Sequence, residues 1–473
     1  MAIQHKAPKA SKTKISFLCQ DCGHSSPKWE GRCAACGAWG TYVEFAEPTR
    51  APRAVRPQGQ ALAPSLAPEP APIGEQSAPA DHRLSLGMPE IDRLLGGGVV
   101  AGSVLLLAGD PGIGKSTLLL QVAAGVARSG RTVLYVSGEE SGAQVRLRAQ
   151  RLGVESSGVL FVAETSVDAV LSVLERTQPG LLIVDSIQTL ATDAAPSTAG
   201  SVAQVRECAQ LLLGWAKSSD APVFLAGHVT KDGGVAGPRV LEHMVDVVLA
   251  MEGEALSSYR VLRCTKNRFG STNEVVLLEM ASDGLAEVAD PSAALIGERS
   301  GNVPGSAIVA TIEGTRPLLC EVQALTSLTG FTPPRRTANG IDANRLVMLA
   351  AVLGRRAGLA LAGQDIMVNV PGGLRIAEPA ADLGIALAIA SSFNDAPLDP
   401  TTVSIGEVGL NGEVRRVPQV ERRLEEAARH GFTRALVPAR NADAAGVPGI
   451  EVVGVESVRA AIAAAMMTAR GVA

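Results

Sequence analysis

The sequence predicts an α/β protein with a parallel sheet in its middle part, a small metal-held module before it and a second α/β domain after it. Three observations lead to this prediction. Apolar strands alternate with helical stretches from residue 81 to 291, a Gly-rich loop joins one strand to a helix, and paired cysteines lie near the N-terminus. The alternation is typical of parallel sheets with crossover helices. We therefore expect domains at 1–45, 81–291 and 292–473, with a linker at 46–80.

Length and composition indicate several hydrophobic cores. The chain has 473 residues, of which 46% are apolar, 19% charged and only 3% aromatic, and its net charge is -4. A chain of this length is expected to form two or three domains. No apolar run is long enough to span a bilayer, and the basic N-terminal segment lacks the apolar stretch of a signal peptide. We expect a cytoplasmic protein that has no membrane partner.

The paired cysteines near the N-terminus have the spacing of a zinc site. Cys19 and Cys22 form one C-x-x-C pair, and Cys33 and Cys36 form the second. Together they offer four thiolates, a tetrahedral set that suits Zn²⁺. A glycine follows each pair and tolerates the positive φ of a tight turn. So small a module needs bound metal for most of its folding free energy. Two redox dithiols are the alternative.

The rest of the chain divides by composition. Proline and alanine dominate residues 46–80, which predicts a disordered or partly extended tether. The middle part contains the expected strands 104–108, 132–136, 181–184 and 223–226. The last part mixes expected strands at 308–312 and 366–369 with Ala-rich helices at 378–393 and 418–430. We expect this last part to be a separate α/β domain.

The Gly-rich loop matches the phosphate-loop pattern G-x-x-x-x-G-K-[ST] at every fixed position. It follows the apolar strand and precedes a helical stretch, the order that such a loop requires. Its glycines let successive N–H groups point at phosphate oxygens, and the helix adds its positive N-terminal end. We expect Lys115 to reach the β- and γ-phosphates of ATP and Ser116 to bind Mg²⁺. The expected nucleotide-binding residues are Gly109, Asp110, Pro111, Gly112, Ile113, Gly114, Lys115, Ser116 and Thr117.

Two further strands end in carboxylates that ATP hydrolysis needs. Asp185 closes a run of four apolar residues, the arrangement that organises Mg²⁺, although it could instead cap a helix. Glu139 and Glu140 follow another strand and lie at the edge where α/β proteins bind ligands. We expect Glu139 to position the attacking water, with Glu140 as the second choice. Exposed charges that begin a helix are the alternative for both.

Polar residues later in the middle part are candidates for coupling. His228 ends a strand before a Gly-rich segment and could sense the γ-phosphate, or it could be structural. Lys266 and Arg268 are two residues apart and would project from one strand face. Two cations on one face suit a phosphate, including one held by a neighbouring subunit in the manner of an arginine finger. A solvated strand face is the alternative.

Taken together, these motifs resemble the bacterial RadA (Sms) family of DNA repair proteins over essentially the whole chain. The resemblance depends on the cysteine module at 19–36, the segment 91–98 before the phosphate loop, S-G-E-E-S at 137–141 and K-N-R-F-G at 266–270. It implies a RecA-like ATPase core, a homo-hexameric ring like the helicase DnaB and ATP-driven branch migration of recombination intermediates. It also implies action alongside RecA and binding to single-stranded and branched DNA.

The last part of the chain resembles the proteolytic domain of Lon proteases. In that alignment Ala380 stands where Lon has its nucleophilic serine, and Glu421 stands where Lon has its lysine. A Ser-Lys dyad needs a hydroxyl and an amine, so we expect no peptidase activity. Arginines of this part are candidates for a DNA path, with solvated surface charge as the alternative. They are Arg335, Arg336, Arg345, Arg355 and Arg356.

The expected function is that of a DNA-dependent ATPase motor that uses ATP and Mg²⁺ and carries Zn²⁺. Lys115, Glu139 and Asp185 would form its catalytic centre, and Lys266 and Arg268 would couple that centre to DNA or to the adjacent subunit. The segments 230–238 and 191–204 are candidate DNA-facing loops. The alternatives are an ATP-dependent Lon-like protease and a RecA-like ring ATPase of signalling that is not stimulated by DNA.

Overall fold

The computed structural model describes residues 14–19, 25–34, 37, 39–47, 83–195, 197–228, 241–253, 258–297, 302–442 and 446–466. The chain divides into two compact units, the first formed by residues 1–250 with 265–270 and the second by residues 251–264 with 271–473. Strands β11 (Val247–Glu252) and β12 (Tyr259–Asn267) each run from one unit into the other. The expected linker 46–80 lies almost entirely outside the described residues.

A parallel sheet forms the centre of the first unit, in the order β11-β6-β10-β9-β7-β8. Parallel pairing joins β6, β10, β9, β7 and β8 in turn. The runs of Val, Leu and Ile in β6, β7 and β9 are buried throughout, as expected for strands covered on both faces. The strands of this series are β6 (Val104–Gly109), β7 (Val133–Ser137), β8 (Leu160–Ala163), β9 (Leu181–Asp185) and β10 (Val223–His228).

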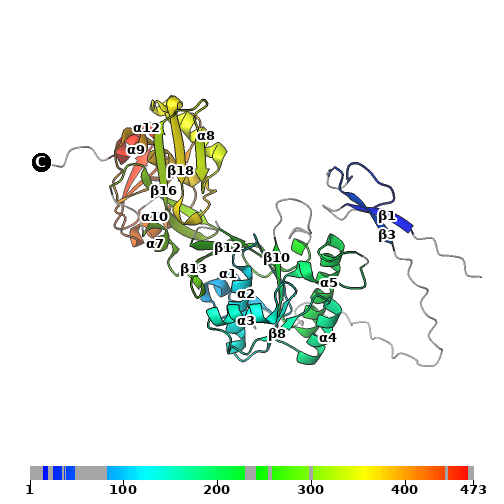
Figure 1. Ribbon diagram of the computed structural model, residues 1–473. Helices are drawn as coiled ribbons and strands as arrows, with labels where there is room; N and C mark the ends of the chain where they lie inside the picture. The colour runs from blue at the N-terminus through cyan, green and yellow to red at the C-terminus, as the bar shows by residue number, and fades with distance from the viewer. Residues whose placement is uncertain are drawn as a thin grey trace, which may run out of the picture. The chain divides into compact units, whose positions relative to one another are not determined.

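Helices cover both faces of this sheet (Figure 1). Helices α2 (Lys115–Arg128) and α3 (Gly142–Arg151) lie on one face, and α4 (Val167–Thr177) and α5 (Val202–Ser219) lie on the other. Serine residues begin three of these helices, because Ser141, Ser166 and Ser201 each accept a hydrogen bond from a backbone N–H of the first turn. Alternate residues of β6, β7 and β9 pack against α4 and α5, which leaves the other set facing α2.

A short N-terminal part precedes the first strand of the sheet. It consists of β4 (Arg83–Leu84), α1 (Pro89–Leu94) and β5 (Val99–Val100), with β4 and β5 paired. The Arg83 guanidinium donates to the Leu95 carbonyl (2.8 Å), the Gly98 carbonyl (3.1 Å) and the Phe269 carbonyl (3.1 Å). This one side chain therefore holds the Gly-rich turn after α1 to the K-N-R-F-G motif.

The cysteine module is a three-stranded antiparallel sheet in the order β2-β1-β3. Its strands are β1 (Lys14–Cys19), β2 (Ser25–Ser26) and β3 (Tyr42–Glu47). Strands β1 and β3 pair along six residues, from Lys14 with Glu47 to Cys19 with Tyr42. Among the described residues of this part, the buried side chains are those of Cys19, Ser26, Cys33 and Tyr42, so the cluster is too small to be a core in the ordinary sense.

The second unit contains an antiparallel meander and a mixed seven-stranded sheet in the order β17-β18-β16-β15-β19-β22-β23. Helices α8, α9 and α12 share one core with the sheet, and α10 packs against a second core with β15, β19 and β22. The meander continues from β12 into β13 (Val275–Ala281) and β14 (Gly284–Glu287), followed by α7 (Pro291–Ile296). The sheet and its helices are β15 (Ser306–Glu313), β16 (Arg316–Leu328), β17 (Arg336–Asn339), α8 (Ala343–Val352), β18 (Gln364–Asn369), α9 (Asp382–Asn394), β19 (Thr402–Ser404), α10 (Val420–Arg429), β22 (Arg434–Pro438), β23 (Glu451–Val455) and α12 (Val458–Ala465).

The mixed α/β fold with a parallel sheet in its first unit is confirmed. Two details differ from expectation. The expected helix 378–393 begins at Asp382, because Pro379 starts a short 3-10 turn before it. The division into compact units assigns β13 and β14 to the second unit, so it does not coincide with the expected limit after residue 291, and the domain limits stay a prediction. Among the described residues, no helix is both long and apolar enough to cross a bilayer.

Candidate active site

The phosphate loop connects the end of β6 to the start of α2. Gly112 (φ 74°) and Gly114 (φ 120°) adopt left-handed conformations that a side chain would disfavour. Lys115 is 4% exposed and donates to the carbonyl oxygens of Gly109 (2.9 Å) and Asp110 (3.0 Å). Ser116 follows it in the first turn of α2. The loop is therefore formed with its lysine folded into the curl, where the phosphates of a nucleotide bind.

Burial lowers the pKa of Lys115, although the negative charges of Asp185, Glu139 and Asp110 oppose this shift. These opposing contributions place the Asp185 and Glu139 carboxylates near the ammonium group. The three residues expected to form the catalytic centre are thus brought together at the carboxyl edge of the sheet. This is the edge at which parallel α/β sheets bind ligands.

Asp185 is the last residue of β9 and is 4% exposed. Tyr135 of β7 donates its hydroxyl to Asp185 Oδ2 at 2.7 Å. The two strands are neighbours, and Tyr135 pairs with Ile183, so Tyr135 and Asp185 lie on the same face of the sheet. Burial and the Asp185 charge raise the pKa of Tyr135 well above its ordinary range, so the hydroxyl keeps its proton. Asp185 does not cap a helix, since the 3-10 turn η3 (Ile187–Thr189) has Ser186 at its N-cap.

Glu139 and Glu140 have different partners. Glu139 Oε1 accepts a hydrogen bond from Ser186 Oγ, the residue after Asp185. Glu140 forms a two-pronged ion pair with Arg148 of α3, one bond of which measures 2.7 Å. Ser137 Oγ accepts from the N–H groups of both residues, at 3.3 and 3.1 Å. Glu140 is held toward α3, whereas Glu139 is held beside the end of β9.

The arrangement fits Mg²⁺ and ATP. Ser116 and Asp185 offer the hydroxyl and the carboxylate that hold the metal in phosphate-loop proteins, and Tyr135 orients the carboxylate from behind. When bound, Mg²⁺ neutralises charge on the phosphate oxygens during transfer. The sequence alone did not suggest Tyr135 or Ser186, because an aromatic residue within an apolar strand indicates core and a lone serine indicates nothing.

Lys266 and Arg268 lie at a different place in the first unit. Lys266 Nζ donates to the carbonyls of Glu242 (2.6 Å) and Val245 (2.8 Å). Arg268 lies just beyond the end of β12 and donates from Nη1 to Asp246 Oδ1 at 2.9 Å. Burial, followed by the charge of nearby Arg268, lowers the pKa of Lys266. The two cations come together through the segment 241–246 rather than through one strand face.

Asp246 fixes the position of this pair relative to the sheet. Its Oδ2 accepts from Val104 N at 3.0 Å, and its own N–H donates to the Val104 carbonyl at 2.9 Å. Val104 begins β6, whereas the phosphate loop follows the last residue, Gly109. Five steps of about 3.3 Å separate these ends by about 16 Å. Arg268 is therefore anchored at the end of β6 that is remote from the phosphate loop of the same chain.

The candidate DNA-facing segments are only partly described. The segment 230–238 and the side chain of His228 lie outside the described residues. In the segment 191–204, Gln204 is 3% exposed and donates to the carbonyls of Thr192, Ala195 and Ser197 at 2.8–3.0 Å. A cavity of about 610 Å³ lies beside it and is lined mainly by hydroxyl and backbone groups. The segment contains Asp193 and neither lysine nor arginine, so any phosphate contact there would come from hydroxyl and N–H groups.

Two of the four expected zinc ligands are described. Cys19 and Cys33 are both buried, and burial against Cys33 raises the pKa of Tyr42 to about 12. Gly37 has φ 77°, and its N–H donates to the Cys33 carbonyl at 2.9 Å, which is the tight turn expected after a C-x-x-C pair. Cys22 and Cys36 lie outside the described residues. The described half of the module thus fits a metal held by thiolates.

The positions aligned with the Lon dyad do not face each other as a reactive pair. Ala380 is 2% exposed, and Glu421 is exposed in the first turn of α10. Two residues from each, Glu378 and Arg423 form a two-pronged ion pair, in which Arg423 is fully buried. Arg423 also donates to the Ala310 carbonyl at 2.7 Å. An internal ion pair thus occupies the region between these two segments of the second unit.

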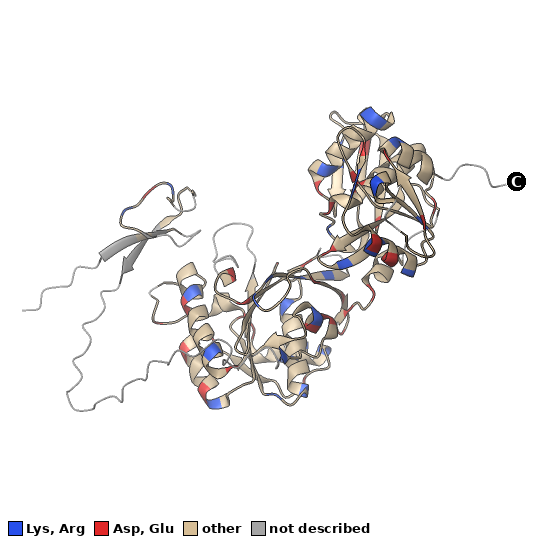
Figure 2. Cartoon of the chain, turned by 180° about the vertical axis from the view of Figure 1, so that it is seen from behind, with Lys and Arg blue, Asp and Glu red and all other residues tan. Residues whose placement is uncertain are grey.

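The arginines proposed for a DNA path differ in their contacts. Arg345 forms a two-pronged ion pair with Asp382, which is 1% exposed, and Arg336 donates to the Leu361 carbonyl at 3.0 Å. Arg335, Arg355 and Arg356 are exposed, and the Arg335 guanidinium lies 3.7 Å from the centre of the Phe331 ring. The first two therefore hold the fold, and the other three face solvent. Acidic and basic residues are interspersed on the helices of each unit (Figure 2).

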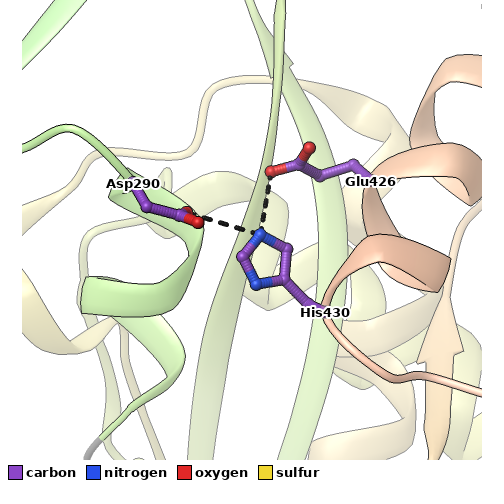
Figure 3. Close-up of side chains that lie close together, drawn as sticks. All are labelled: Asp290, Glu426 and His430. Carbon is purple, nitrogen blue, oxygen red and sulfur yellow. Dashed lines mark ion pairs between the residues drawn. The ribbon is translucent and has the colours of Figure 1, made fainter.

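Asp290, Glu426 and His430 form a cluster in the second unit (Figure 3). His430 Nε2 lies 3.4 Å from Asp290 Oδ1 and 3.3 Å from Glu426 Oε1. The guanidinium of Arg429 is also present, 2.9 Å from Glu426 Oε1 and 3.7 Å from Asp290 Oδ1. Because a protein cation already balances these carboxylates, we interpret the cluster as an ion-pair network that joins α7 to α10 and not as a metal site.

Parts of the chain are similar to known protein families. The chain matches the family described as an AAA domain over residues 69–234 and the family described as a rubredoxin metal binding domain over residues 17–44. Residues 345–441 match the family described as subunit ChlI of Mg-chelatase. A KaiC-like protein from Pyrococcus horikoshii OT3 is 20% identical, with a TM-score of 0.37, 44% of this chain and 99% of that chain being covered. So low a score carries no argument.

Three bacterial relatives match the chain over nearly its full length. Each is called DNA repair protein RadA. The Bacillus subtilis relative is 49% identical, with 96% of this chain and 98% of the relative covered. The Halalkalibacterium halodurans relative is 48% identical over 96% and 98%, and the Listeria monocytogenes relative is 47% identical over 97% and 99%.

Proposed function

The chain belongs to the family of the DNA repair protein RadA, and on that premise we propose that it is an ATP-hydrolysing motor of recombinational DNA repair. It acts on single-stranded and branched DNA, migrates branches together with RecA and assembles as a homo-hexameric ring. Phosphate neutralisation supplies most of its DNA affinity, so binding weakens steeply as salt rises.

The catalytic roles follow from the contacts at the carboxyl edge of the sheet. Lys115 binds the β- and γ-phosphates, and Ser116 and Asp185 hold Mg²⁺. Glu139 positions the attacking water, because its neighbour Glu140 is committed to Arg148. Tyr135 is a positioning residue that fixes the Asp185 carboxylate.

The position of Arg268 is the observation that supports assembly into a ring. An arginine anchored about 16 Å from its own phosphate loop is poorly placed to act in the same subunit. It is half exposed and retains N–H donors beyond the one that Asp246 accepts. In a head-to-tail ring each subunit offers such a surface to the next one. Arg268, with Lys266 beside it, then completes the nucleotide site of the adjacent subunit as an arginine finger.

Subunit mixing tests this assignment. Lys115→Ala and Arg268→Ala are each expected to be inactive alone, since each lacks one half of every site. An equal mixture of the two contains intact sites at about a quarter of the head-to-tail contacts, so ATP turnover should partly return. If Arg268 acts within its own subunit, every site in the mixture stays defective and no activity returns.

The DNA requirement is tested with the wild type and a further variant. ATP turnover is measured with and without single-stranded DNA for the wild type and for Lys266→Ala. We expect DNA to stimulate the wild type and Lys266→Ala to lose that stimulation. Unchanged turnover in both cases would instead favour a ring ATPase of signalling. Cleavage of casein by the intact protein would favour the Lon-like protease and would contradict our interpretation of Ala380 and Glu421.

A further inference from the structure

The hydrogen bond between Ser186 and Glu139 has a consequence for how hydrolysis is controlled. Ser186 is fully buried and donates its hydroxyl to Glu139 Oε1. Glu139 is the residue that we assign to the attacking water. A carboxylate oxygen that accepts from a protein hydroxyl has one lone pair fewer for a water. The bond therefore holds Glu139 in a position in which its capacity to take the water's hydrogen bond is reduced.

Ser186 belongs to a segment that packs directly on the backbone beside Glu139. The 3-10 turn η3 follows it, and Thr189 of this turn lies against Gly138, where an added Cβ would come within 2.2 Å of Thr189 Oγ1. Thr189 Oγ1 in turn donates to the Ser186 carbonyl at 2.8 Å. With so little space between them, η3 cannot shift without changing the surroundings of Glu139.

The candidate DNA-facing segment 191–204 continues from this turn. Four hydrogen bonds to the Gln204 side chain hold its first half: one from Thr192 N and three to the carbonyls of Thr192, Ala195 and Ser197. A loop tied in this way moves as one piece. Displacement of the segment is thus passed on to η3, with only Leu190 in between.

The side chain of Gln188 in η3 bears on whether this turn can shift. Its amide nitrogen and oxygen are both buried, and neither has a hydrogen-bond partner among the described residues. The nitrogen lies 3.7 Å from the Cβ position built on Gly227, next to the carboxyl end of β10. A buried amide without partners is unfavourable and rare in native structures. An arrangement of η3 that satisfies this amide would compensate for the loss of the Ser186 bond.

We propose that Ser186 is a positioning residue that restrains Glu139 in the absence of DNA, and that a shift of η3 driven by DNA on the segment 191–204 releases it. The inference rests on the proposed function for the identity of the ligand. The bond between Ser186 and Glu139 would thereby make ATP hydrolysis conditional on DNA. Nucleotide binding, which depends on the phosphate loop, would be unaffected.

The test measures steady-state ATP turnover of full-length Ser186→Ala with and without single-stranded DNA. Without DNA, turnover is expected to rise about tenfold or more, because one hydrogen bond to a charged group is worth at least that factor. Turnover with DNA should stay close to that of the wild type, so the stimulation ratio falls, and the KM for ATP should not change. Ser186→Thr keeps the hydroxyl and should behave as the wild type.

Gln188→Leu is an independent variant that should strengthen the restraint on Glu139, whereas Ser186→Ala should remove it. Leucine removes the unpartnered amide and so favours the restrained arrangement, and DNA stimulation should fall without any rise in turnover in the absence of DNA. The inference is overturned if Ser186→Ala turns over ATP no faster than the wild type without DNA, or if both variants keep the wild-type stimulation ratio. A wild type that DNA does not stimulate contradicts the proposed function, while the DNA-free rate of Ser186→Ala still decides whether Ser186 restrains Glu139.

Discussion

Both units bury cationic side chains, and Lys115 of the first unit and Arg423 of the second have different kinds of partner. Lys115 in the first unit is 4% exposed and donates to two backbone carbonyls, and burial lowers its pKa. Arg423 in the second unit is fully buried, at 0% exposed, and forms a two-pronged ion pair with Glu378. The comparison teaches that the lysine of the phosphate loop is held by backbone carbonyls with carboxylates nearby, whereas the buried arginine of the second unit is neutralised by a two-pronged ion pair.

Removal of Arg423 should give the largest effect on stability. Arg423→Met leaves the partly buried Glu378 carboxylate, which is 21% exposed, without its ionic partner, so the cost should lie near the lower end of the about 3–5 kcal/mol for breaking a buried pair. Arg422→Met on the same helix is the matched control, because that side chain is exposed and should change stability little. Chemical denaturation followed by circular dichroism measures both. Equal stability of the two variants would show that the ion pair is not structural.

Acidification should reduce the difference in the free energy of unfolding between the wild type and Arg423→Met. Burial raises the pKa of Glu378, but the hydrogen bonds and charge of Arg423 outweigh it and hold the pKa below its ordinary value of 4.5. In the wild type the pair's contribution is present above pH 4.5 and is lost as the pH falls through the lower folded-state pKa. In the variant burial is opposed only by the hydrogen bonds from Ile312 N and Thr311 Oγ1, so the Glu378 carboxyl is protonated more readily than in the wild type and the penalty shrinks as the pH falls. Denaturation at pH 7.5 and pH 5 measures this change.

Removal of Lys115 should abolish catalysis without a loss of stability. Lys115→Met lacks the contact to the phosphates, and ATP turnover should fall by about a hundredfold or more. Because its folded-state pKa is lowered, the charged lysine is disfavoured in the nucleotide-free fold, and the variant should unfold at the same or a higher temperature. Lys217→Met, an exposed change in α5, is the control. Strong destabilisation of Lys115→Met would remove the contrast with Arg423.

Tyr135→Phe should have a smaller effect on the same site. It deletes only the hydroxyl that orients Asp185, so we expect about a tenfold weaker apparent affinity for Mg²⁺. Turnover at saturating Mg²⁺ should recover most of the wild-type rate. A titration of Mg²⁺ at fixed ATP measures the shift, and an unchanged midpoint would show that Tyr135 does not position the carboxylate.

The smallest expected effect is on peptide cleavage. Ala380→Ser combined with Glu421→Lys restores the two residue types of the Lon dyad, yet we expect no detectable casein cleavage. The reason is that position 421 is exposed, whereas position 380 is buried, so an amine and a hydroxyl would not share an environment. Cleavage by the double variant would show that only the two side chains are missing.

The sequence predicted those parts of the site that depend on local order along the chain. The expected strands 181–184 and 223–226 correspond to β9 and β10, which extend to the polar residues Asp185 and His228 because sheet pairing does not stop where the apolar run ends. The phosphate loop, Asp185 and Glu139 were all expected at the carboxyl edge, and they lie there. Their assigned roles stay predictions.

The contacts that depend on strand order were not predicted. Tyr135 supports Asp185 only because β7 lies beside β9, and a pattern along the chain does not give the order of strands in a sheet. Asp246 was not suggested either, although it places Arg268 at the start of β6. The motif K-N-R-F-G therefore indicated that Lys266 and Arg268 are functional. It did not indicate whether they act on the nucleotide site of their own subunit or on that of the adjacent subunit.

The place of β6 in the sheet also affects when the site can form during synthesis. Its neighbours are β10 and β11, and Val223 of β10 pairs with Val104 from about 120 residues further along the chain. The phosphate loop therefore leaves the ribosome long before β10 and β11, the strands that pair with β6. Contacts between such distant segments form slowly. Nucleotide binding is thus acquired late, after β10 and β11 have emerged, and a nascent chain that stops earlier carries the loop without the site.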